Sequence, residues 1–240
     1  MNTAGKNESG TSNDRFDVVI VGYGGAGAAA AIEAADNGAR VLVLDRAYGG
    51  GASALSGGVV YAGGGTRQQR DAGYGDTAEN LYAYLSMEAG DAVDEATLRR
   101  FCDQSPGMIP WLEEQGATFA GSLAPYKTSY PTDKHYLYFS GNEKAYPYRD
   151  AAQPAPRGHR TIAKGLSSGK VLWTRMAESA SRKGVTFAPL ARVTDLMMED
   201  GAVVGVKYRV LEQSHPNAAE HRRLTKRTQK IGNWAPGLVK

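Results

Sequence analysis

The stretch that decides the fold is residues 17–45, which read DVVIVGYGGAGAAAAIEAADNGARVLVLD. It begins with a short apolar run, Asp17 to Val21, that is rich in β-branched side chains. Such a run is typical of a strand that is buried on both faces in a parallel sheet. The run leads directly into GYGGAG at residues 22–27, where the glycines have the G-x-G-x-x-G spacing. The stretch therefore predicts a strand that ends in a tight, glycine-rich turn.

The three glycines of this spacing each have a steric role. Gly22 allows the tight turn off the strand, and Gly24 lets the backbone approach a pyrophosphate closely. Gly27 lets the next helix pack against the strand. The amides at the start of that helix face an anion with the positive end of the helix dipole. The turn is therefore predicted to bind a dinucleotide.

The residues after the turn complete the same unit. Residues 28–36 are alanine-rich and predict a helix that stops at Asn37-Gly38, and residues 40–44 predict a second strand. That strand ends at Asp45, whose carboxylate is placed to accept hydrogen bonds from an adenosine ribose. The alternative is a glycine-rich turn in an α/β protein that binds nothing. Strand, glycines, helix, second strand and acid all follow in order, which favours the dinucleotide interpretation.

A second glycine-rich stretch, YGGGASALSGGVVYAGGGT at residues 48–66, indicates which dinucleotide. A nicotinamide enzyme has no need of such a segment after its second strand, whereas extended flavin adenine dinucleotide (FAD) needs a second backbone loop along its pyrophosphate and ring. Glycines permit positive φ and close approach, and Ser53 and Ser56 add short hydroxyl donors. The alternative is a flexible linker, but Val59-Val60-Tyr61 interrupts the run with residues typical of packed structure.

The two glycine motifs together, GYGGAG at 22–27 and GGASALSGG at 50–58, resemble the fumarate reductase/succinate dehydrogenase flavoprotein superfamily. Within it, the sequence is most similar to the FAD-dependent 3-ketosteroid dehydrogenases, from about Phe16 onward. The resemblance implies that FAD is the cofactor and assigns contacts along its length. It implies that Gly22, Gly24, Gly25, Ala26 and Gly27 surround the pyrophosphate, that Asp45 takes the ribose position and Arg46 lies beside the adenosine, that Gly51, Ala52 and Ser53 return to the pyrophosphate, that Ser56, Gly57 and Gly58 approach the flavin ring, and that the backbone of Val193 contacts the adenine.

The composition is that of an ordinary globular protein, with 42% hydrophobic and 22% charged residues among 240. No apolar stretch approaches the length of a membrane span, and the start of the chain lacks the charged-then-apolar pattern of a signal peptide. Residues 1–14 are small and polar and are predicted to be a disordered leader. These patterns predict a soluble, cytoplasmic protein. They give no information on its oligomeric state.

Two residue types exclude other classes of site. The single cysteine, Cys102, excludes an internal disulfide and a multi-cysteine metal site, and is expected to be a buried structural thiol. The four histidines show no ligand spacing, so no metal is expected.

Residues 217–240 hold six Lys/Arg and one acid, Glu220. Because Trp234 is their only aromatic residue, we interpret them as a solvated basic connection and expect no nucleic-acid partner.

The rest of the chain predicts scaffold. Capping residues and periodicity predict helices, and β-branched runs around an Asp-Gly pair predict a hairpin. The expected helices cover about 76–88, 94–103, 105–116 and 169–184, and the expected strands cover 185–188, 192–198 and 203–210.

Residues 122–160 have no sustained period and contain six of the thirteen tyrosines. One hypothesis is a loop that lines a large apolar substrate cavity, and the alternative is an irregular surface segment whose tyrosines cover the scaffold. His159 and Arg160 are candidates to meet a carboxylate or a flavin oxygen. A His-Arg pair in a loop is more often plain surface.

The predicted fold is an α/β, Rossmann-like FAD-binding domain with a parallel sheet and a β-hairpin/meander insertion. Residues 15–240 are predicted to form the N-terminal part of a discontinuous domain that is incomplete at its C-terminus. The resemblance implies dehydrogenation of a 3-ketosteroid, by α-proton abstraction and hydride transfer to flavin N5, with catalytic residues mainly beyond Lys240. One alternative is reduction of an unsaturated acid such as fumarate, with Arg157, His159 and Arg160 as carboxylate-binding cations. Another is an FAD-binding fragment without turnover.

Overall fold

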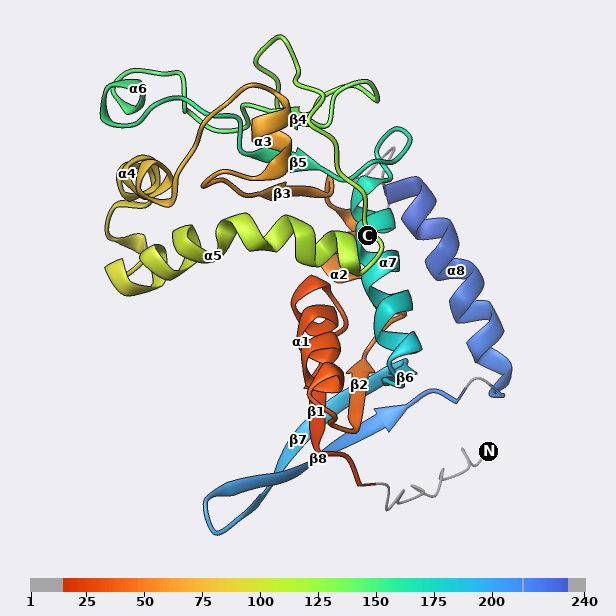
Figure 1. Cartoon of the computed structure of the whole chain (residues 1–240). Helices are drawn as coiled ribbons and strands as arrows, with labels where there is room; N and C mark the ends of the chain where they lie inside the picture. Colours follow the sequence, from red (N-terminus) through yellow and green to blue (C-terminus); the bar gives the residue numbers. More distant parts are fainter. Residues whose placement is uncertain (1–14, 213, 233–240) are drawn as a thin grey trace, which may run out of the picture.

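The computed structural model describes residues 15–212 and 214–232 (Figure 1). The predicted leader at 1–14 and the end of the basic segment at 233–240 lie outside these residues. Two three-stranded sheets and one strand pair are joined by helices. The strands are β1 (Val18–Val21), β2 (Val41–Asp45), β3 (Val59–Tyr61), β4 (Leu137–Tyr138), β5 (Gly158–Arg160), β6 (Thr186–Pro189), β7 (Ala191–Glu199) and β8 (Ala202–Val210). The helices are α1 (Gly25–Asp36), α2 (Gly51–Leu55), α3 (Arg67–Asp71), α4 (Ala78–Ala89), α5 (Glu95–Glu114), α6 (Tyr148–Ala151), α7 (Ser168–Arg182) and α8 (Pro216–Gly232), with a 3-10 turn at Gly90–Ala92.

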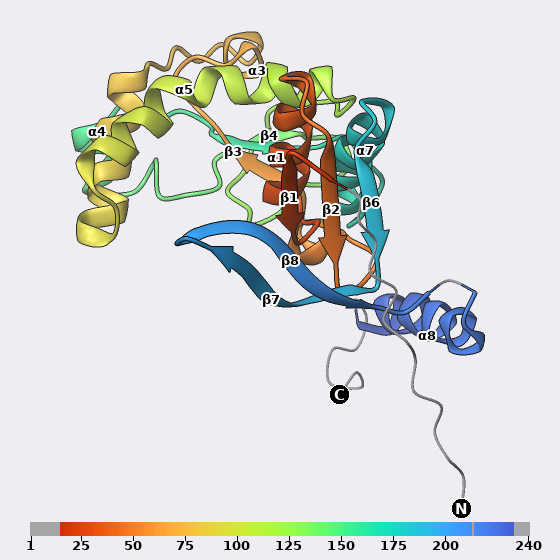
Figure 2. The same cartoon turned by 90° about the horizontal axis from the view of Figure 1, so that it is seen from below.

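The first sheet is parallel and has the order β1-β2-β6. Its central strand β2 is mostly buried, because it has a neighbouring strand on each side and α1 packs against it. The third strand, β6, comes from residues far downstream, and Figure 2 shows the three strands side by side. α1 ends where the sequence predicts, at Asn37 and a left-handed Gly38 with φ +81°. The predicted strand–helix–strand unit is therefore present in a parallel sheet.

The second sheet has the order β3-β5-β4 and is antiparallel throughout its ladder. Its central strand β5, Gly158–Arg160, is completely buried. Both outer strands come from segments that the sequence analysis singled out: β3 from the second glycine-rich stretch and β4 from the tyrosine-rich segment. This sheet therefore joins two regions that are about 80 to 100 residues apart in the chain.

The helix α5 differs from the prediction of two helices that meet at Ser105-Pro106. It runs without a break from Glu95 to Glu114, with Pro106 and Pro110 inside it. One buried face explains the continuity, because its members recur at helical spacing on both sides of Pro106. This packing outweighs the loss of a backbone donor at each proline. The buried members are Leu98, Cys102, Ser105, Ile109 and Leu112.

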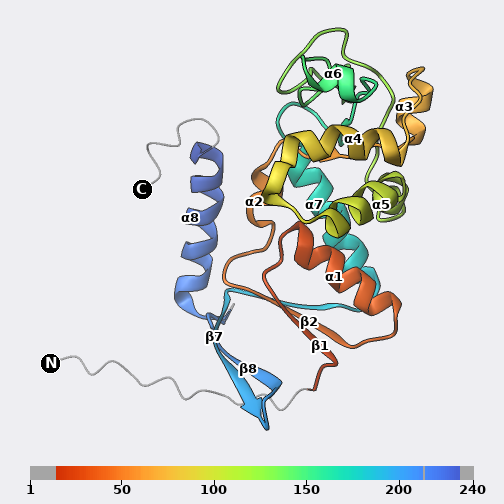
Figure 3. The ribbon, with the colours of Figure 1, turned by 90° about the vertical axis from the view of Figure 1, so that its left-hand side faces the viewer.

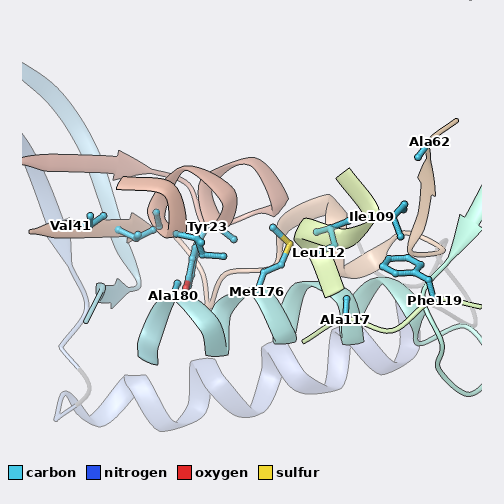
Figure 4. Packing of buried hydrophobic residues seen from close by; sticks show 13 residues of the cluster. Tyr23, Val41, Ala62, Ile109, Leu112, Ala117, Phe119, Met176 and Ala180 are labelled. Atoms are coloured by element: carbon cyan, nitrogen blue, oxygen red, sulfur yellow. The ribbon is translucent and has the colours of Figure 1, made fainter. Parts of the chain in front are cut away.

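One hydrophobic core connects the parallel sheet to α5 and the second sheet (Figure 4). Ile32 of α1 and Val43 of β2 are buried members of this core between α1 and the sheet. Met176 and Ala180 are its buried members on α7. Small alanines on α1 and α7 allow the two helices to approach closely, and they pack against each other directly. The core therefore holds the start of α1 in a fixed position relative to α7. Cys102 lies in a separate small cluster as a buried free thiol, as predicted.

β7 and β8 pair in antiparallel fashion around Asp200 and Gly201, which both have positive φ. The pair extends away from the parallel sheet, and α8 lies on the side of the molecule where α2 and α7 run (Figure 3). α8 is a helix that the sequence analysis did not predict, because residues 216–232, within the expected basic connection, are helical. Pro216 occupies the first turn and the following residues are mostly strong helix formers, which accounts for the difference. Among the described helices, none is long and apolar enough to cross a membrane.

Candidate dinucleotide site

The turn between β1 and α1 depends on glycine at two positions. Gly22 has φ +99°, a left-handed conformation that favours glycine, and its amide donates to the carbonyl of Leu44 at 2.7 Å. A Cβ on Gly27 would lie 2.0 Å from the carbonyl oxygen of Gly22. The close packing of helix against turn that the motif predicts is therefore present, and it leaves no room for a side chain at Gly27.

The start of α1 presents backbone donors without acceptors. Within the described part of the chain, no acceptor is present for the amides of Gly24 and Ala26, whereas the Gly25 amide donates to Ser53 Oγ at 3.0 Å. Ala26 is exposed. Because the first amides of a helix lack intrahelical partners and lie at its positive end, this end of α1 can bind an anion.

Asp45 connects the end of β2 to the glycine turn. Its Oδ2 accepts the amide of Tyr23 at 2.8 Å, and its Oδ1 accepts the amide of Ala47 at 2.7 Å. A carboxylate has about four lone-pair positions, so each oxygen can accept one further donor. Asp45 therefore shapes the turn itself, in addition to the ribose contact that the sequence predicts for it.

Tyr23, a variable position of the motif, is an anchor that the sequence analysis missed. Its ring is 3% exposed and packs against the rings of Trp173 and Phe187. Its carbonyl accepts the Gly50 amide and Trp173 Nε1, both at 2.8 Å. Burial raises the pKa of its phenol. The glycine turn is thereby tied to α7, and the aromatic residue at position 23 is the only sequence signal of this role.

The second glycine-rich stretch folds back onto the first. Residues 51–55 form the short helix α2, where the sequence analysis expected a loop. Gly51 has φ +48°, and a Cβ there would lie 3.6 Å from Gly24 Cα. Together with the Ser53 bond to Gly25, this brings the two predicted pyrophosphate segments to one place. Ala52, Leu55 and Ser56 are exposed beside it, with Leu55 62% exposed.

The segment Ser56–Gly57–Gly58 is packed from behind by two later segments. A Cβ on Gly57 would lie 2.7 Å from the Tyr130 ring, and a Cβ on Gly58 would lie 2.3 Å from the Ser168 backbone. Gly58 also has φ +61°, and its carbonyl accepts the Thr161 amide at 3.0 Å. Both glycines are therefore required by close approach, and neither Tyr130 nor Ser168 stood out in the sequence.

The pair His159–Arg160 is not plain surface, contrary to the more common pattern. Arg157, His159 and Arg160 are all completely buried, because β5 is the central strand of its sheet. Arg157 forms an ion pair with Asp76, and Arg160 forms one with Asp133. Burial lowers the pKa of His159 to about 4, so this imidazole is neutral. Arg160 does meet a carboxylate, but it belongs to this chain.

The tyrosines of residues 122–160 differ in exposure, which bears on the hypotheses of a cavity-lining loop and of an irregular surface segment. Tyr138 is buried, while Tyr126 and Tyr146 are 48% and 74% exposed. A cavity of about 310 Å³ is lined by residues 124–127 and by Phe139, Gly141, Asn142, Lys144 and Ala145, with Tyr126 as its one tyrosine among the described lining residues. Tyr126 therefore lines this cavity, and the cavity hypothesis stays a prediction for the other tyrosines of the segment.

The remaining predicted site residues, Arg46 and Val193, lie near the end of β2. Arg46 is exposed directly after β2. Val193 lies half-buried on β7, near the end of β2, where the Leu190 amide donates to the carbonyl of Ala47. Among the described residues, no group of three or more His, Cys, Asp or Glu side chains is placed to hold a metal.

This geometry matches proteins of known structure and activity. The chain is 46% identical over 217 residues to the 3-oxo-5-alpha-steroid 4-dehydrogenase of Comamonas testosteroni. The aligned part covers 88% of this chain and 41% of that protein. The structure of a 3-ketosteroid-delta4-(5alpha)-dehydrogenase from Rhodococcus jostii RHA1, in complex with 4-androstene-3,17-dione, superposes with a TM-score of 0.78 at 39% identity, over 81% of this chain and 42% of that one. A flavocytochrome c3 fumarate reductase superposes with a TM-score of 0.62 at 28% identity, over 80% and 30%.

The chain thus spans about two fifths of the length of the steroid dehydrogenases that it matches. These likenesses confirm the resemblance on which the sequence analysis relied. The free amides at the start of α1, the side-chain-free approach at Gly27 and the adjoining α2 fit an extended dinucleotide. The sequence model of the family described as FAD binding domain matches residues 17–239, and the chain belongs to this FAD-binding family.

Proposed function

We propose that this chain forms the FAD-binding part of an oxidoreductase that dehydrogenates a 3-ketosteroid. The observation that supports this most is the meeting of the two glycine-rich stretches at the start of α1, where Ser53 Oγ accepts the Gly25 amide. The identity of 46% to a 3-oxo-5-alpha-steroid 4-dehydrogenase supports the substrate class. The tyrosine-rich segment supplies little separate support, because Tyr126 is the one tyrosine among the described lining residues of the cavity of about 310 Å³.

Within this proposal, each predicted residue has a place along the cofactor. Gly24, Gly25, Ala26 and the turn around them hold the pyrophosphate, helped by Gly51, Ala52 and Ser53. Asp45 holds the ribose, with Arg46 and Val193 toward the adenosine. Ser56, Gly57 and Gly58 lie toward the flavin ring. The free amide donors at Gly24 and Ala26 and the exposure of Ala52 and Ser56 support this placement of the cofactor.

The finer description of the fold is part of the proposal. The β1–turn–α1–β2 unit corresponds to a Rossmann-like dinucleotide unit, and the β7–β8 pair corresponds to an insertion after the third parallel strand. Residues 15–240 correspond to one part of the FAD-binding domain of the longer relatives. The parallel register of β1, β2 and β6 supports this correspondence.

When bound, the flavin supplies the acceptor for the electron pair that leaves the substrate in a dehydrogenation. The residues of this chain bind and orient the cofactor, and the Tyr130 ring and the Ser168–Gly169 backbone cover Ser56–Gly58 from behind. We assign no catalytic residue in this chain. The buried His159 is held by Thr66 Oγ1 at 2.8 Å and by the carbonyl of Arg157 at 3.0 Å, so both of its ring nitrogens already have partners.

A second candidate reaction is the reduction of an unsaturated acid, supported by the likeness to a fumarate reductase. This reaction requires cations that grip substrate carboxylates. Arg157 and Arg160 do not supply them, because both are buried and paired within the chain. The steroid reaction is therefore the better-supported proposal.

The test is to titrate the purified chain with FAD and record the flavin absorbance that survives washing. Gly27→Ala is expected to abolish retention, because its Cβ would lie 2.0 Å from the Gly22 carbonyl oxygen. Gly75→Ala is the matched control, since a Cβ there meets nothing within 4 Å. Spectral changes on adding a 3-ketosteroid, but not fumarate, would support the substrate class. A wild-type chain that binds no FAD would overturn the proposed site, and a response to fumarate alone would favour the second reaction.

A further inference from the structure

Arg160 is a completely buried guanidinium whose donors all point to oxygen atoms of this chain. Its Nε donates to Tyr130 Oη at 2.9 Å and to Ser168 Oγ at 3.1 Å. Its terminal nitrogens donate to the carbonyl oxygens of Pro131 and Ala163, both at 3.1 Å, to the Gly165 carbonyl, and to Asp133 Oδ1 at 2.8 Å. The guanidinium also lies over the Tyr130 ring, 4.5 Å from its centroid. One side chain thus ties together three segments: its own strand β5, residues 130–133 and residues 163–168.

Two of these segments are the ones that pack behind Ser56–Gly58. The Tyr130 ring occupies the space that a Cβ on Gly57 would need, and the Ser168–Gly169 backbone occupies the space at Gly58. Gly169 also lies against the backbone of Ser53 and Ser56, where a Cβ would lie 2.6 and 2.3 Å from their carbonyl oxygens. Tyr130 Oη and Ser168 Oγ are themselves 3.2 Å apart. Arg160 therefore fixes both contacts at once, from behind the glycine segment.

The planar fork of arginine is required for this arrangement. A guanidinium has five N–H donors in fixed directions, whereas a lysine ammonium has three and no planar geometry. A lysine at this position has two fewer donors than arginine to share among the two hydroxyls, three carbonyls and carboxylate. The substitution Arg160→Lys would therefore keep the charge and lose part of the tie between the Tyr130 and Ser168 segments.

We propose that Arg160 is a positioning residue for the flavin-ring end of the cofactor site, acting through Tyr130 and Ser168 on Ser56–Gly58. The inference rests on the proposed function, because it takes Ser56–Gly58 to be the segment beside the ring. It predicts that Arg160 controls how the ring end of FAD is held, while the pyrophosphate end at α1 is unaffected.

Arg157 supplies a matched control, because it is equally buried but pairs with Asp76, away from Ser56–Gly58. The experiment compares wild type, Arg160→Lys and Arg157→Lys in the full 240-residue chain. Three quantities are measured: the melting temperature, the affinity for FAD and for ADP (a probe without the ring), and the visible circular dichroism of bound FAD. Tyr130→Phe is added, since it keeps the ring against Gly57 and removes the hydroxyl that Arg160 holds.

Both lysine variants are expected to melt at a lower temperature than wild type. Arg160→Lys alone is expected to weaken FAD binding by about tenfold, to leave ADP binding unchanged and to alter the visible circular dichroism. Tyr130→Phe is expected to change the same spectrum to a smaller extent, and it decides the test if Arg160→Lys does not fold.

Two results would overturn the inference while leaving the proposed site intact. One is equal loss of FAD and ADP affinity in Arg160→Lys, which indicates a general loss of structure. The other is a flavin spectrum in Arg160→Lys and Tyr130→Phe that matches wild type. A wild-type chain that binds ADP but not FAD would instead refute the proposed function, and the inference with it.

Discussion

Arg157 and Arg160 lie three residues apart on and beside one buried strand, and both are completely removed from solvent, yet their charges are compensated in different ways. Arg157 forms its ion pair with Asp76, whose two oxygens accept its Nε and Nη2 at 3.1 and 3.0 Å, and its guanidinium lies 4.9 Å from the centroid of the Tyr84 ring. Its Nη1 has no partner among the described residues. Arg160 relies on two hydroxyls, three carbonyls and the 46% exposed Asp133.

The comparison shows two solutions to the burial of a cation. A single buried ion pair concentrates the compensation in one contact, so removing the partner leaves an unpaired charge in the interior. A set of neutral oxygens distributes the compensation, so no single partner is essential. The Arg157 pair ties Asp76, at the entry to α4, to the second sheet, and Arg160 ties residues 130–133 and 163–168 together behind the glycine-rich site. We expect the first to dominate stability and the second to dominate the geometry of the site.

The largest expected effect is that of Asp76→Asn. It removes the charge of the carboxylate that pairs with the buried Arg157 guanidinium, so we expect the free energy of unfolding to fall by about 3–5 kcal/mol. Burial alone would raise the pKa of Asp76, but the hydrogen bonds and charge of Arg157 outweigh it and hold the pKa below its ordinary value. Stability from this group is therefore present above the unfolded pKa, near 4, and lost as the pH falls through the lower folded value. Urea unfolding at pH 7 tests the loss, and a decrease below about 1 kcal/mol would contradict the single-partner interpretation.

The next effect concerns His159, which lies between the two arginines. Its pKa is lowered by burial from 6.5 to about 4, so the unfolded chain takes up a proton in this range before the folded chain does. Stability is therefore expected to fall by roughly 3 kcal/mol as the pH drops from 6.5 to 4. The measurement is the urea midpoint at half-unit steps of pH. His159→Gln should remove this part of the slope, and an unchanged slope would assign it to other groups.

A smaller effect is expected at Gly57, where the distributed contacts of Arg160 meet the site. Gly57→Ala places a Cβ 2.7 Å from a Tyr130 ring that Arg160 holds in place, so we expect a loss of about 1–3 kcal/mol. In a Tyr130→Ala background the same substitution should cost much less, because the obstructing ring is gone. Additive losses in this double-mutant cycle would show that Tyr130 is not the obstruction.

The smallest effect is expected for Asp133→Asn, the counterpart of Asp76→Asn. The Gly165 amide and then Arg160 lower the pKa of Asp133, but its carboxylate is half exposed and Arg160 retains five neutral acceptors. We expect the melting temperature to change by at most about 2 °C. A decrease as large as that of Asp76→Asn, measured in parallel, would remove the distinction between the two arginines.

Local patterns in the sequence predicted the first unit of the site. The glycine spacing, the apolar run before it and Asp45 lie within 29 residues, and each constrains its neighbours directly. The burial of Arg160 was not predictable in this way, because three of its partners, including Tyr130 and Asp133, lie 27 to 30 residues away on an irregular segment. The same applies to Arg157, whose carboxylate partner is 81 residues away. At Ser105-Pro106, the local pattern typical of a helix start was outweighed by the packing of one continuous buried face along α5.

The order of the parallel sheet has a consequence for how this protein is made. β2 is complete at Asp45, but its second neighbour, β6, begins only at Thr186, about 140 residues later. At 5–20 residues per second, a ribosome needs roughly 7 to 28 s to synthesise the intervening chain. During that time β2 has one open edge, and Tyr23 lacks both Trp173 and Phe187. The glycine turn is therefore synthesised well before the residues that complete the packing of Tyr23.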